Sequence, residues 1–285
     1  MNMILICPSD VSGVPALARK CPLVLTPFLG RTVLEYALTA LAEGGAKNVR
    51  ILASDRAEQI RRVVGRGEAW GMTIELVPVS DETDLAPDAA SAAGPILTLD
   101  HLAQLPQQPL WLSYRGWYGA QQALMPVLAR QRVGMREVMP NAFAGLRSQM
   151  APDARMIGPC WIGSDVFIGS RVVIGPGTVI EDGSYVDEGA EVVGSIVGPR
   201  TYVGAFTEVR DSFAWGKDLL HLGTGSMTEV NDRLLLGEVR EKRNLARSLV
   251  NVFRGKRAQE VSVQRGPKLV GLSPAAVGFK PMPGD

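Results

Sequence analysis

Residues 160–197 read CWIGSDVFIGSRVVIGPGTVIEDGSYVDEGAEVVGSIV, and within this stretch an apolar residue returns at every sixth position. We call these the repeat positions. The same spacing begins upstream at Met150. Downstream, it continues to Trp215 after a one-residue slip that follows Val192. The repeat positions are Met150, Met156, Ile162, Ile168, Ile174, Ile180, Val186 and Val192, followed by Val197, Val203, Val209 and Trp215.

Two further features accompany the repeat positions. The next residue is often glycine or acidic, as at Gly163, Gly169, Gly175, Glu181, Asp187, Gly198, Gly204 and Gly216. A small or β-branched residue lies near the fourth position after each: Ala154, Cys160, Val166, Val172, Thr178, Ser184, Ala190, Ile196, Thr201 and Thr207. This pattern is typical of a parallel β-helix, in which each short strand buries one apolar side chain and a small residue turns the corner.

The physical reason for a β-helix is that one six-residue unit cannot bury its apolar face alone. Successive coils must stack, and each strand must pair with the strand one full turn away. A β-sandwich of alternating strands would not hold a six-residue period over this length. The slip after Val192 indicates a local bulge or a corner loop.

The bulk composition is that of a globular protein with room for two domains. The chain has 285 residues, a net charge of +1 and 46% hydrophobic residues, so no basic excess indicates a nucleic acid partner. The three cysteines lack metal-ligand spacing, and we expect Cys160 to be buried and the compartment to be reducing and cytoplasmic. No apolar run approaches the roughly 20 residues of a membrane span, and the N-terminus lacks signal-peptide features.

The N-terminal third alternates predicted strands and helices. Short apolar runs predict strands over residues 3–7, 48–53 and 72–79. Leucines on helical spacing predict a helix over residues 32–43 that stops at a glycine pair. Asp55 with Glu58 resembles a capping box and predicts a second helix. This order predicts an α/β domain with a parallel sheet and with any ligand at the carboxyl ends of its strands.

A family resemblance covers about residues 3–100. Residues 21–79 contain a Pro-x-x-Gly-Arg helix start, a Leu-Glu-Tyr within the helix, and a Trp-Gly before the third strand. These motifs resemble the first half of sugar-phosphate nucleotidyltransferases, which implies a shortened, Rossmann-like version of that domain. Residues 192–220 are similar to the tails of mannose-1-phosphate guanylyltransferase-like proteins. The repeat itself resembles the left-handed β-helix of hexapeptide-repeat proteins, and only this resemblance supplies the handedness.

The resemblance also implies a nucleotide site, at which this chain departs from the family. The family uses a loop of the form Gly-Gly-x-Gly-Thr-Arg to cradle a triphosphate, but residues 8–14 read PSDVSGV. Asp10 adds a negative charge where the phosphates would lie. The resemblance assigns nucleotide binding to Ser12, Gly13 and Arg19, and it leaves Lys20 as the one candidate for the catalytic cation.

The metal part of that site is reduced as well. Residues 95–100 read PILTLD and resemble the strand that ends in the family's metal-binding aspartate, which implies that Asp100 is a Mg²⁺ ligand. No convincing second aspartate follows within residues 101–149. An aromatic segment either stacks on a sugar ring or base or fills a core and domain interface, the reading we favour. This segment contains Trp111, Tyr114, Arg115, Trp117 and Tyr118.

A hexapeptide-repeat acyltransferase is the rival enzyme class. Many such proteins bind acyl-CoA between coils and use a histidine as general base. The chain has two histidines, His101 and His221, and we expect His221 to close the end of the last coil. The histidines and cysteines lie too far apart in sequence for a zinc site.

The C-terminal part combines a basic segment and a tail. Residues 240–257 are basic, with apolar residues on one helical face. This helix either caps the open end of the β-helix or lies on an anionic membrane surface as a peripheral contact. Residues 258–285 lack periodicity and are predicted to be a flexible tail or a strap that orders on a partner.

Together these features predict four segments: an α/β domain over residues 1–145, a left-handed β-helix over 146–222, a capping segment with the basic helix over 223–257, and a tail over 258–285. The leading hypothesis is a catalytically degenerate nucleotidyltransferase-like protein of nucleotide-sugar and cell-surface polysaccharide biosynthesis. It would act in binding, regulation or scaffolding of partner enzymes, as a homo-oligomer, for which the repeat class suggests a trimer. The alternative is an active sugar-1-phosphate nucleotidyltransferase that uses Mg²⁺, Lys20 and Asp100.

Overall fold

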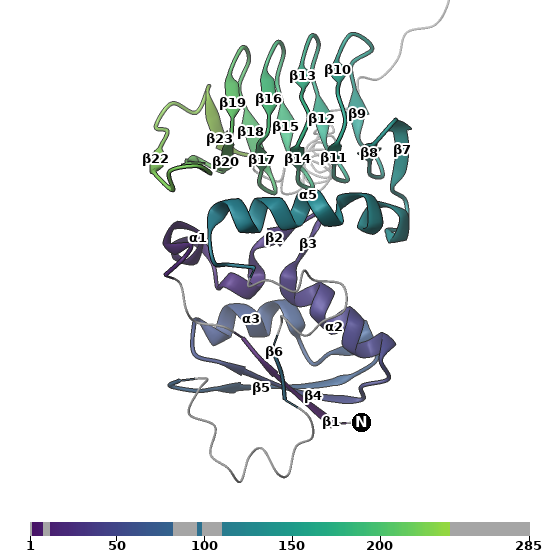
Figure 1. The fold of residues 1–285 in the computed structure, drawn as a ribbon, viewed down its shortest axis with the longest axis vertical. Helices are drawn as coiled ribbons and strands as arrows, with labels where there is room; N and C mark the ends of the chain where they lie inside the picture. Colours follow the sequence, from purple (N-terminus) through teal and green to yellow (C-terminus); the bar gives the residue numbers. More distant parts are fainter. Residues whose placement is uncertain (1, 8–11, 82–95, 99–109, 240–285) are drawn as a thin grey trace, which may run out of the picture. The chain divides into compact units, whose positions relative to one another are not determined.

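The computed structural model describes residues 2–7, 12–81, 96–98 and 110–239 (Figure 1). Several predictions from sequence therefore lie outside the described residues. These are the metal role of Asp100, the position of His101, the basic helix over residues 240–257 and the tail over residues 258–285.

The N-terminal part contains a four-stranded sheet in which every neighbouring pair of strands is parallel. Its strands lie in the order β5-β4-β1-β6, with Ile4, Leu5 and Ile51 buried in the core. The bounds are β1 (Asn2–Ile6), β4 (Asn48–Ala53), β5 (Thr73–Pro78) and β6 (Ile96–Thr98). The strands predicted over residues 3–7, 48–53 and 72–79 are confirmed to within one residue at each end.

The predicted helix after the first strand is confirmed as α2 (Val33–Glu43). It begins with a capping box that the sequence analysis missed. The Thr32 hydroxyl accepts a hydrogen bond from the Glu35 backbone N–H at 3.2 Å, and the Glu35 carboxylate accepts one from the Thr32 N–H at 2.6 Å. Each side chain thus satisfies a backbone donor that the helix leaves free.

The capping box predicted at Asp55 and Glu58 is wrong, although the helix itself exists as α3 (Ala57–Val64). The residue that caps α3 is Arg56, which has a φ of 42° and makes no side-chain cap hydrogen bond. The Asp55 carboxylate instead pairs with the Arg56 guanidinium at 2.7 Å. Competition from this adjacent cation turns the carboxylate away from the helix terminus.

The remaining elements of this part are short except for one long helix. A two-residue turn at Leu29 and Gly30 joins β2 to β3, which pair as an antiparallel hairpin. The long helix, α5, begins at an N-cap serine, Ser113, whose hydroxyl accepts from the Gly116 N–H at 3.0 Å. The bounds are α1 (Pro15–Lys20), η1 (Leu23–Leu25), β2 (Pro27–Phe28), β3 (Arg31–Thr32), η2 (Glu68–Trp70) and α5 (Tyr114–Gln131).

The six-residue repeat folds as a β-helix, whose stacked coils are seen in Figure 1. Three sheets form its faces. The first contains β7 (Arg136–Met139), β8 (Ala142–Ala144), β11 (Cys160–Ile162), β14 (Thr178–Ile180), β17 (Ile196–Val197), β20 (Ser212–Trp215), β21 (Asp218–His221) and β22 (Met227–Glu229). The second contains β9 (Gln149–Met150), β12 (Phe167–Ile168), β15 (Tyr185–Val186), β18 (Thr201–Val203) and β23 (Leu236–Glu238). The third contains β10 (Arg155–Met156), β13 (Val173–Ile174), β16 (Glu191–Val193) and β19 (Glu208–Arg210).

The strand register confirms the predicted period. Cys160 pairs with Thr178 and Ile162 with Ile180, so one coil spans 18 residues, or three repeats. Most of the repeat positions and the small residues between them fill the interior, including Cys160, which is fully buried. The prediction that Met150 is buried is wrong, because it lies on the edge strand β9 and is 37% exposed. This interior consists of Ala142, Ala144, Met156, Cys160, Ile162, Val166, Ile168, Val172, Ile174, Ile180, Val186, Ala190, Val192, Val197, Val203, Val209, Ala214 and Leu236.

The slip after Val192 is a shortened corner. Val192 pairs with Val209, 17 residues on, and no register shift interrupts the ladder there. Only Gly194 and Ser195 separate β16 from β17, so the corner-loop alternative is confirmed and the bulge is not. The prediction that Trp215 lies inside is wrong. Val197 pairs with Ala214, again 17 residues on, so Ala214 points inward and Trp215 is only partly buried.

The C-terminal end of the β-helix is closed by antiparallel strands. β21 pairs antiparallel with β20 and with β22, and β23 pairs antiparallel with β18. These strands protect the ends of the first and second sheets from further pairing, whereas the third sheet ends at β19 within the described residues. His221 is the last residue of β21, where its ring accepts from the Thr224 N–H at 3.2 Å. No helix in the described part of the chain is long and apolar enough to cross a bilayer.

Helix α5 packs along the first sheet of the β-helix (Figure 1). The Trp117 and Phe213 rings meet edge to face at 5.1 Å, and the Tyr118 hydroxyl donates to the Gly177 carbonyl at 2.9 Å. Trp111, Tyr114 and Trp117 are all buried. The aromatic segment therefore fills a core that the α/β part shares with the β-helix. The predicted division at residues 145 and 146 stays a prediction.

Candidate functional site

In the loop predicted to bind phosphates, the backbone of residues 111 and 112 lies directly against Gly13. A side chain at this position would bring its Cβ to 2.3 Å from the Trp111 carbonyl oxygen and 2.4 Å from the Leu112 carbonyl oxygen. Glycine is required here because two backbone segments approach closely. Ser12 is exposed, and residues 8–11 lie outside the described part of the chain. The acceptors that face Gly13 are carbonyls, which repel a phosphate.

Lys20, the predicted catalytic cation, contacts the C-terminal hairpin of the β-helix. Its ammonium group pairs with the Asp218 carboxylate at 2.6 Å and also donates to the Trp215 carbonyl. The same group lies 5.0 Å from the centre of the Trp215 ring. An ammonium group has three donors, and two of them are used here. This geometry gives Lys20 a role in joining α1 to the β-helix, while its catalytic role remains a prediction.

Arg19 lies beside the same hairpin. Its guanidinium is 3.8 Å from the Met227 sulfur, and its backbone carbonyl accepts from Arg56 at 3.4 Å. A hollow between α1 and the hairpin has a volume of about 10 Å³, which is room for about one water molecule. The structure brings Arg19 and Lys20 together, but at a filled interface with no space for a nucleotide.

His221 does not have the geometry of a general base. Its Nδ1 accepts a hydrogen bond from the Thr224 backbone N–H at 3.2 Å, which requires this nitrogen to lack a proton. In the neutral ring the proton is then on Nε2, so neither nitrogen is free to remove a proton from a substrate. The described residues therefore assign His221 to the turn between β21 and β22.

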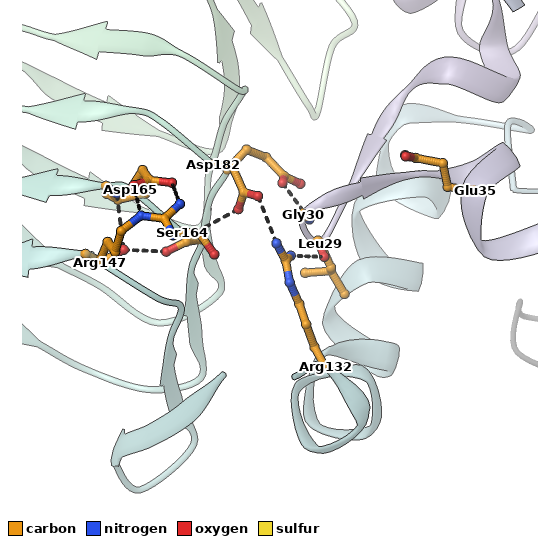
Figure 2. A network of polar contacts seen from close by, with 12 residues as sticks. Leu29, Gly30, Glu35, Arg132, Arg147, Ser164, Asp165 and Asp182 are labelled. Atoms are coloured by element: carbon orange, nitrogen blue, oxygen red, sulfur yellow. Dashed lines mark hydrogen bonds and ion pairs between the residues drawn. The ribbon is translucent and has the colours of Figure 1, made fainter. Parts of the chain in front are cut away.

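The polar contacts that sequence reasoning missed join the α/β part to the β-helix (Figure 2). The Arg132 guanidinium donates to the Asp182 carboxylate at 2.8 Å and to the Leu29 carbonyl at 3.0 Å. The Gly30 N–H donates to the Glu181 carboxylate at 2.6 Å. We call these five residues the interdomain network. Glu181 could have been found from sequence, because it replaces the glycine that usually follows a repeat position.

The turn within this network is strained and tightly fitted. Leu29 has a φ of 50°, which is unusual for a bulky residue, and Gly30 has a φ of 82°. The Leu29 carbonyl accepts from both the Arg132 guanidinium and the Tyr36 hydroxyl, each at 3.0 Å. A Cβ on Gly30 would lie 1.3 Å from an Arg132 nitrogen. Glycine is therefore needed both for the turn and for the close approach of the guanidinium.

Glu181 is the most perturbed carboxyl of the network. Its side chain is 2% exposed, and burial, followed by the nearby Asp182 charge, raises its pKa from 4.5 to about 8. One oxygen accepts from Gly30, while the other has no hydrogen-bond partner among the described residues. Such a buried group with a pKa near neutrality is typical of functional sites as well as of structural ion networks.

A polar cavity of about 330 Å³ adjoins the interdomain network. Arg132 belongs to both, and Tyr36, which lines the cavity, donates to the Leu29 carbonyl of the network. The cavity is lined by Arg31, Tyr36, Thr39, Glu43, Leu128, Gln131 and Arg132. Its volume is within the range of small-molecule sites, roughly 300 to 1,000 Å³. The described residues include no cluster of three or more histidine, cysteine or carboxylate ligands for a metal, so the Mg²⁺ expectation stays a prediction.

Comparison with known proteins supports the repeat. Residues 159–194 match a family model described as bacterial transferase hexapeptide (six repeats). A search of curated proteins finds no significant match. Among solved structures, the chain is similar to a histidine-to-asparagine mutant of perosamine N-acetyltransferase from Caulobacter crescentus, crystallised with CoA and GDP-perosamine. The identity is 16%, the match covers 64% of this chain and 97% of that chain, and the TM-score is 0.14.

These findings separate the two halves of the sequence-based interpretation. The hexapeptide repeat is supported by the family model and by the strand register. The resemblance of the N-terminal part to nucleotidyltransferases is not confirmed, since the family model covers residues 159–194 alone. The family model favours the hexapeptide transferase alternative over a nucleotidyltransferase, and the structural similarity is too low to add to that argument.

Proposed function

We propose that this protein is a catalytically degenerate, nucleotidyltransferase-like binding and scaffolding protein of nucleotide-sugar metabolism. The observation that carries the proposal is the engagement of Lys20. The ammonium group that would neutralise a developing phosphate charge is instead held by Asp218 and by the Trp215 carbonyl. A cation committed to an ion pair cannot also stabilise a transition state without breaking that pair.

The other predicted phosphate-binding residues support the same proposal. Gly13 faces the carbonyls of Trp111 and Leu112, and Arg19 lies against Met227. A triphosphate site depends on converging N–H groups and cations, whereas these residues are used for packing. The resemblance to polysaccharide-biosynthesis proteins leads us to include partner enzymes of that setting, in a reducing cytoplasm, in the proposal.

We include self-association in the same proposal. Helix α5 covers the first sheet of the β-helix through Trp117 and Tyr118, which leaves the second and third sheets for contact between copies. Closed symmetric assemblies are the usual result when one face of a subunit pairs with another. A homo-trimer, as the resemblance suggests, is the expected state in sedimentation analysis.

A nucleotidyl-transfer assay tests the proposal. The protein is incubated with each NTP, Mg²⁺ and a panel of sugar 1-phosphates, and pyrophosphate is measured. We expect no pyrophosphate above a protein-free blank. Turnover by the wild type that is lost in Lys20→Ala and kept in Lys217→Ala would overturn the proposal. Lys217 is the matched control, because it lies on the same hairpin and pairs with Glu229.

The second candidate is a hexapeptide-repeat acyltransferase, favoured by the family model that matches residues 159–194. The general base would then be His101, since His221 is held in a turn. Acetyl-CoA should raise the melting temperature if this candidate is right, because a ligand that binds only the folded state stabilises it. Acetyl transfer to an amino sugar that is lost in His101→Ala and kept in His221→Ala would establish this candidate. A melting temperature that acetyl-CoA leaves unchanged would exclude it.

A further inference from the structure

The cavity beside the interdomain network is distant from the predicted phosphate loop. The Ala16 N–H donates to the hydroxyl of Tyr114, the first residue of α5, at 2.8 Å. The cavity instead adjoins the last turn of α5, where Leu128, Gln131 and Arg132 line it. At 1.5 Å per residue, the two ends of this 18-residue helix are roughly 25 Å apart. The cavity is therefore a separate place in the molecule.

The cationic side of the cavity has an arginine that is open to a ligand. The Arg31 side chain is exposed, lies with its guanidinium 5.8 Å from the centre of the Tyr36 ring, and donates one long hydrogen bond of 3.4 Å to the Thr39 hydroxyl. No ion pair engages Arg31 within the described residues. A guanidinium has five N–H donors arranged to meet two oxygens at once. Arg31 therefore offers most of its donors to an anion.

The second guanidinium is fixed in position. Arg132 uses one donor on Asp182 and one on the Leu29 carbonyl, which leaves three of its five donors. Its side chain is 17% exposed, so these contacts hold it rigidly at the border of the cavity. A positioned cation binds an anion with less loss of side-chain entropy than a mobile one.

The rest of the lining suits hydroxyl groups. Glu43 contributes a carboxylate and Gln131 an amide, whereas the Thr39 hydroxyl already donates to the Glu35 carbonyl at 2.8 Å. A carboxylate accepts hydrogen bonds from hydroxyls, and an amide both accepts and donates them. One apolar residue, Leu128, lines the same space and suits the carbon face of a ring. Two cations and two further hydrogen-bonding side chains in one cavity match one class of ligand.

We propose that this cavity binds a small phosphorylated sugar, with its phosphate on Arg31 and Arg132 and its hydroxyls on Glu43 and Gln131. The proposal deepens the binding function proposed above and rests on it for the class of pathway, while the site follows from the lining alone. Bound ligand would contact α2 and α5 together. It would thereby secure the strained Leu29–Gly30 turn through which the α/β part contacts Glu181 and Asp182.

Calorimetric titration of the full chain with glucose 1-phosphate, inorganic phosphate and glucose tests this site. We expect glucose 1-phosphate to bind at least about tenfold more tightly than either of the other two. Arg31→Gln should weaken glucose 1-phosphate roughly tenfold or more. Arg130→Gln is the matched control, since Arg130 is an exposed arginine in the last turn of α5 that does not line the cavity. The control should bind like the wild type.

A second variant tests the hydroxyl side of the cavity. Glu43→Gln should reduce the preference for glucose 1-phosphate over inorganic phosphate and leave the affinity for phosphate alone equal to or above that of the wild type. The proposed site would be wrong if the wild type did not bind glucose 1-phosphate, or if Arg31→Gln bound it as tightly as the wild type. Phosphate binding without any preference for the sugar would overturn the ligand class. Pyrophosphate release in the transfer assay would instead refute the proposed function and leave this result standing.

Discussion

The interior of the β-helix and the interdomain network are built on opposite principles. The interior repeats one apolar contact from coil to coil, as in the ladder of Ile162 on Ile180 and Ile180 on Val197. In the network each group has its own partner, as Arg132 has Asp182 and Gly30 has Glu181. The interior stabilises by the sum of equivalent burials, whereas the network depends on the match of particular atoms.

The two regions also differ in how completely their polar groups are satisfied. In the interior, Thr178 and Ser184 donate to backbone carbonyls at 3.0 Å and 2.8 Å. Where α5 meets the β-helix, several buried side-chain atoms have no partner among the described residues. These are Trp117 Nε1, both amide atoms of Gln121, Gln122 Oε1, Trp161 Nε1 and Glu181 Oε1, whereas the coils away from α5 contribute one such atom, Thr207 Oγ1. Buried groups of this kind cost stability.

Truncation of an interior repeat position should give the largest effect at a fixed pH. Ile180 is fully buried between coils, so Ile180→Ala should lower the free energy of unfolding by about 3 kcal/mol through lost burial and a residual cavity. Urea denaturation followed by circular dichroism measures this change. Val133→Ala is the control, because Val133 is 93% exposed and should change stability by less than about 0.5 kcal/mol. Equal effects at the two positions would contradict the apolar interior.

The network should respond to pH where the interior does not. The pKa of Glu181 is 4.5 in its ordinary state and about 8 in the folded chain. Between these values the unfolded chain releases the proton and the folded chain keeps it, so raising the pH favours unfolding by roughly 1.4 kcal/mol per pH unit. Glu181→Gln cannot titrate. Its stability relative to the wild type should therefore rise steadily between about pH 5 and pH 8.

Chemical denaturation at several pH values measures this difference. Glu68→Gln is the matched control, since Glu68 is exposed and should follow the wild type at every pH. The Glu181 interpretation would be wrong if the wild type and Glu181→Gln lost stability in parallel as the pH rises. It would also be wrong if the wild type gained stability relative to the variant as the pH rises, because that would mean a lowered pKa.

The two regions differ as well in what the sequence could predict. The interior was predictable because burial imposes the same six-residue period on every coil, and the register of Cys160 on Thr178 follows from it. Trp215 was misassigned because a one-residue shortening moves each later side chain to the opposite face. The network was not predictable, since no local pattern connects Arg132 with Asp182, 50 residues away. The acidic residue in a position where glycine is common, Glu181, was its one visible signal.

The ion pair between Lys20 and Asp218 should have a moderate effect that separates a structural role from a catalytic one. Both side chains are less than a quarter exposed, so a double-mutant cycle of Lys20→Ala and Asp218→Ala should give a coupling energy of about 1 kcal/mol. Thermal or urea unfolding of the four proteins measures it. Strictly additive effects would mean that the pair contributes nothing. Neither variant should alter the binding of glucose 1-phosphate, because that cavity lies at the other end of α5.

The smallest effect is expected at an ion pair that resembles those of the network but lies on a corner of the β-helix. Arg147 and Asp165 are in contact at 2.5 Å, yet their side chains are 71% and 50% exposed, and water and salt screen such pairs. Arg147→Ala should therefore leave the unfolding midpoint unchanged within error, in low and in high salt. A clear loss of stability in Arg147→Ala, with little loss of stability in Lys20→Ala, would contradict the expected order of these two ion pairs. Stability would then come from the regular corners of the repeat, and the contact between α1 and the hairpin would be incidental to the fold.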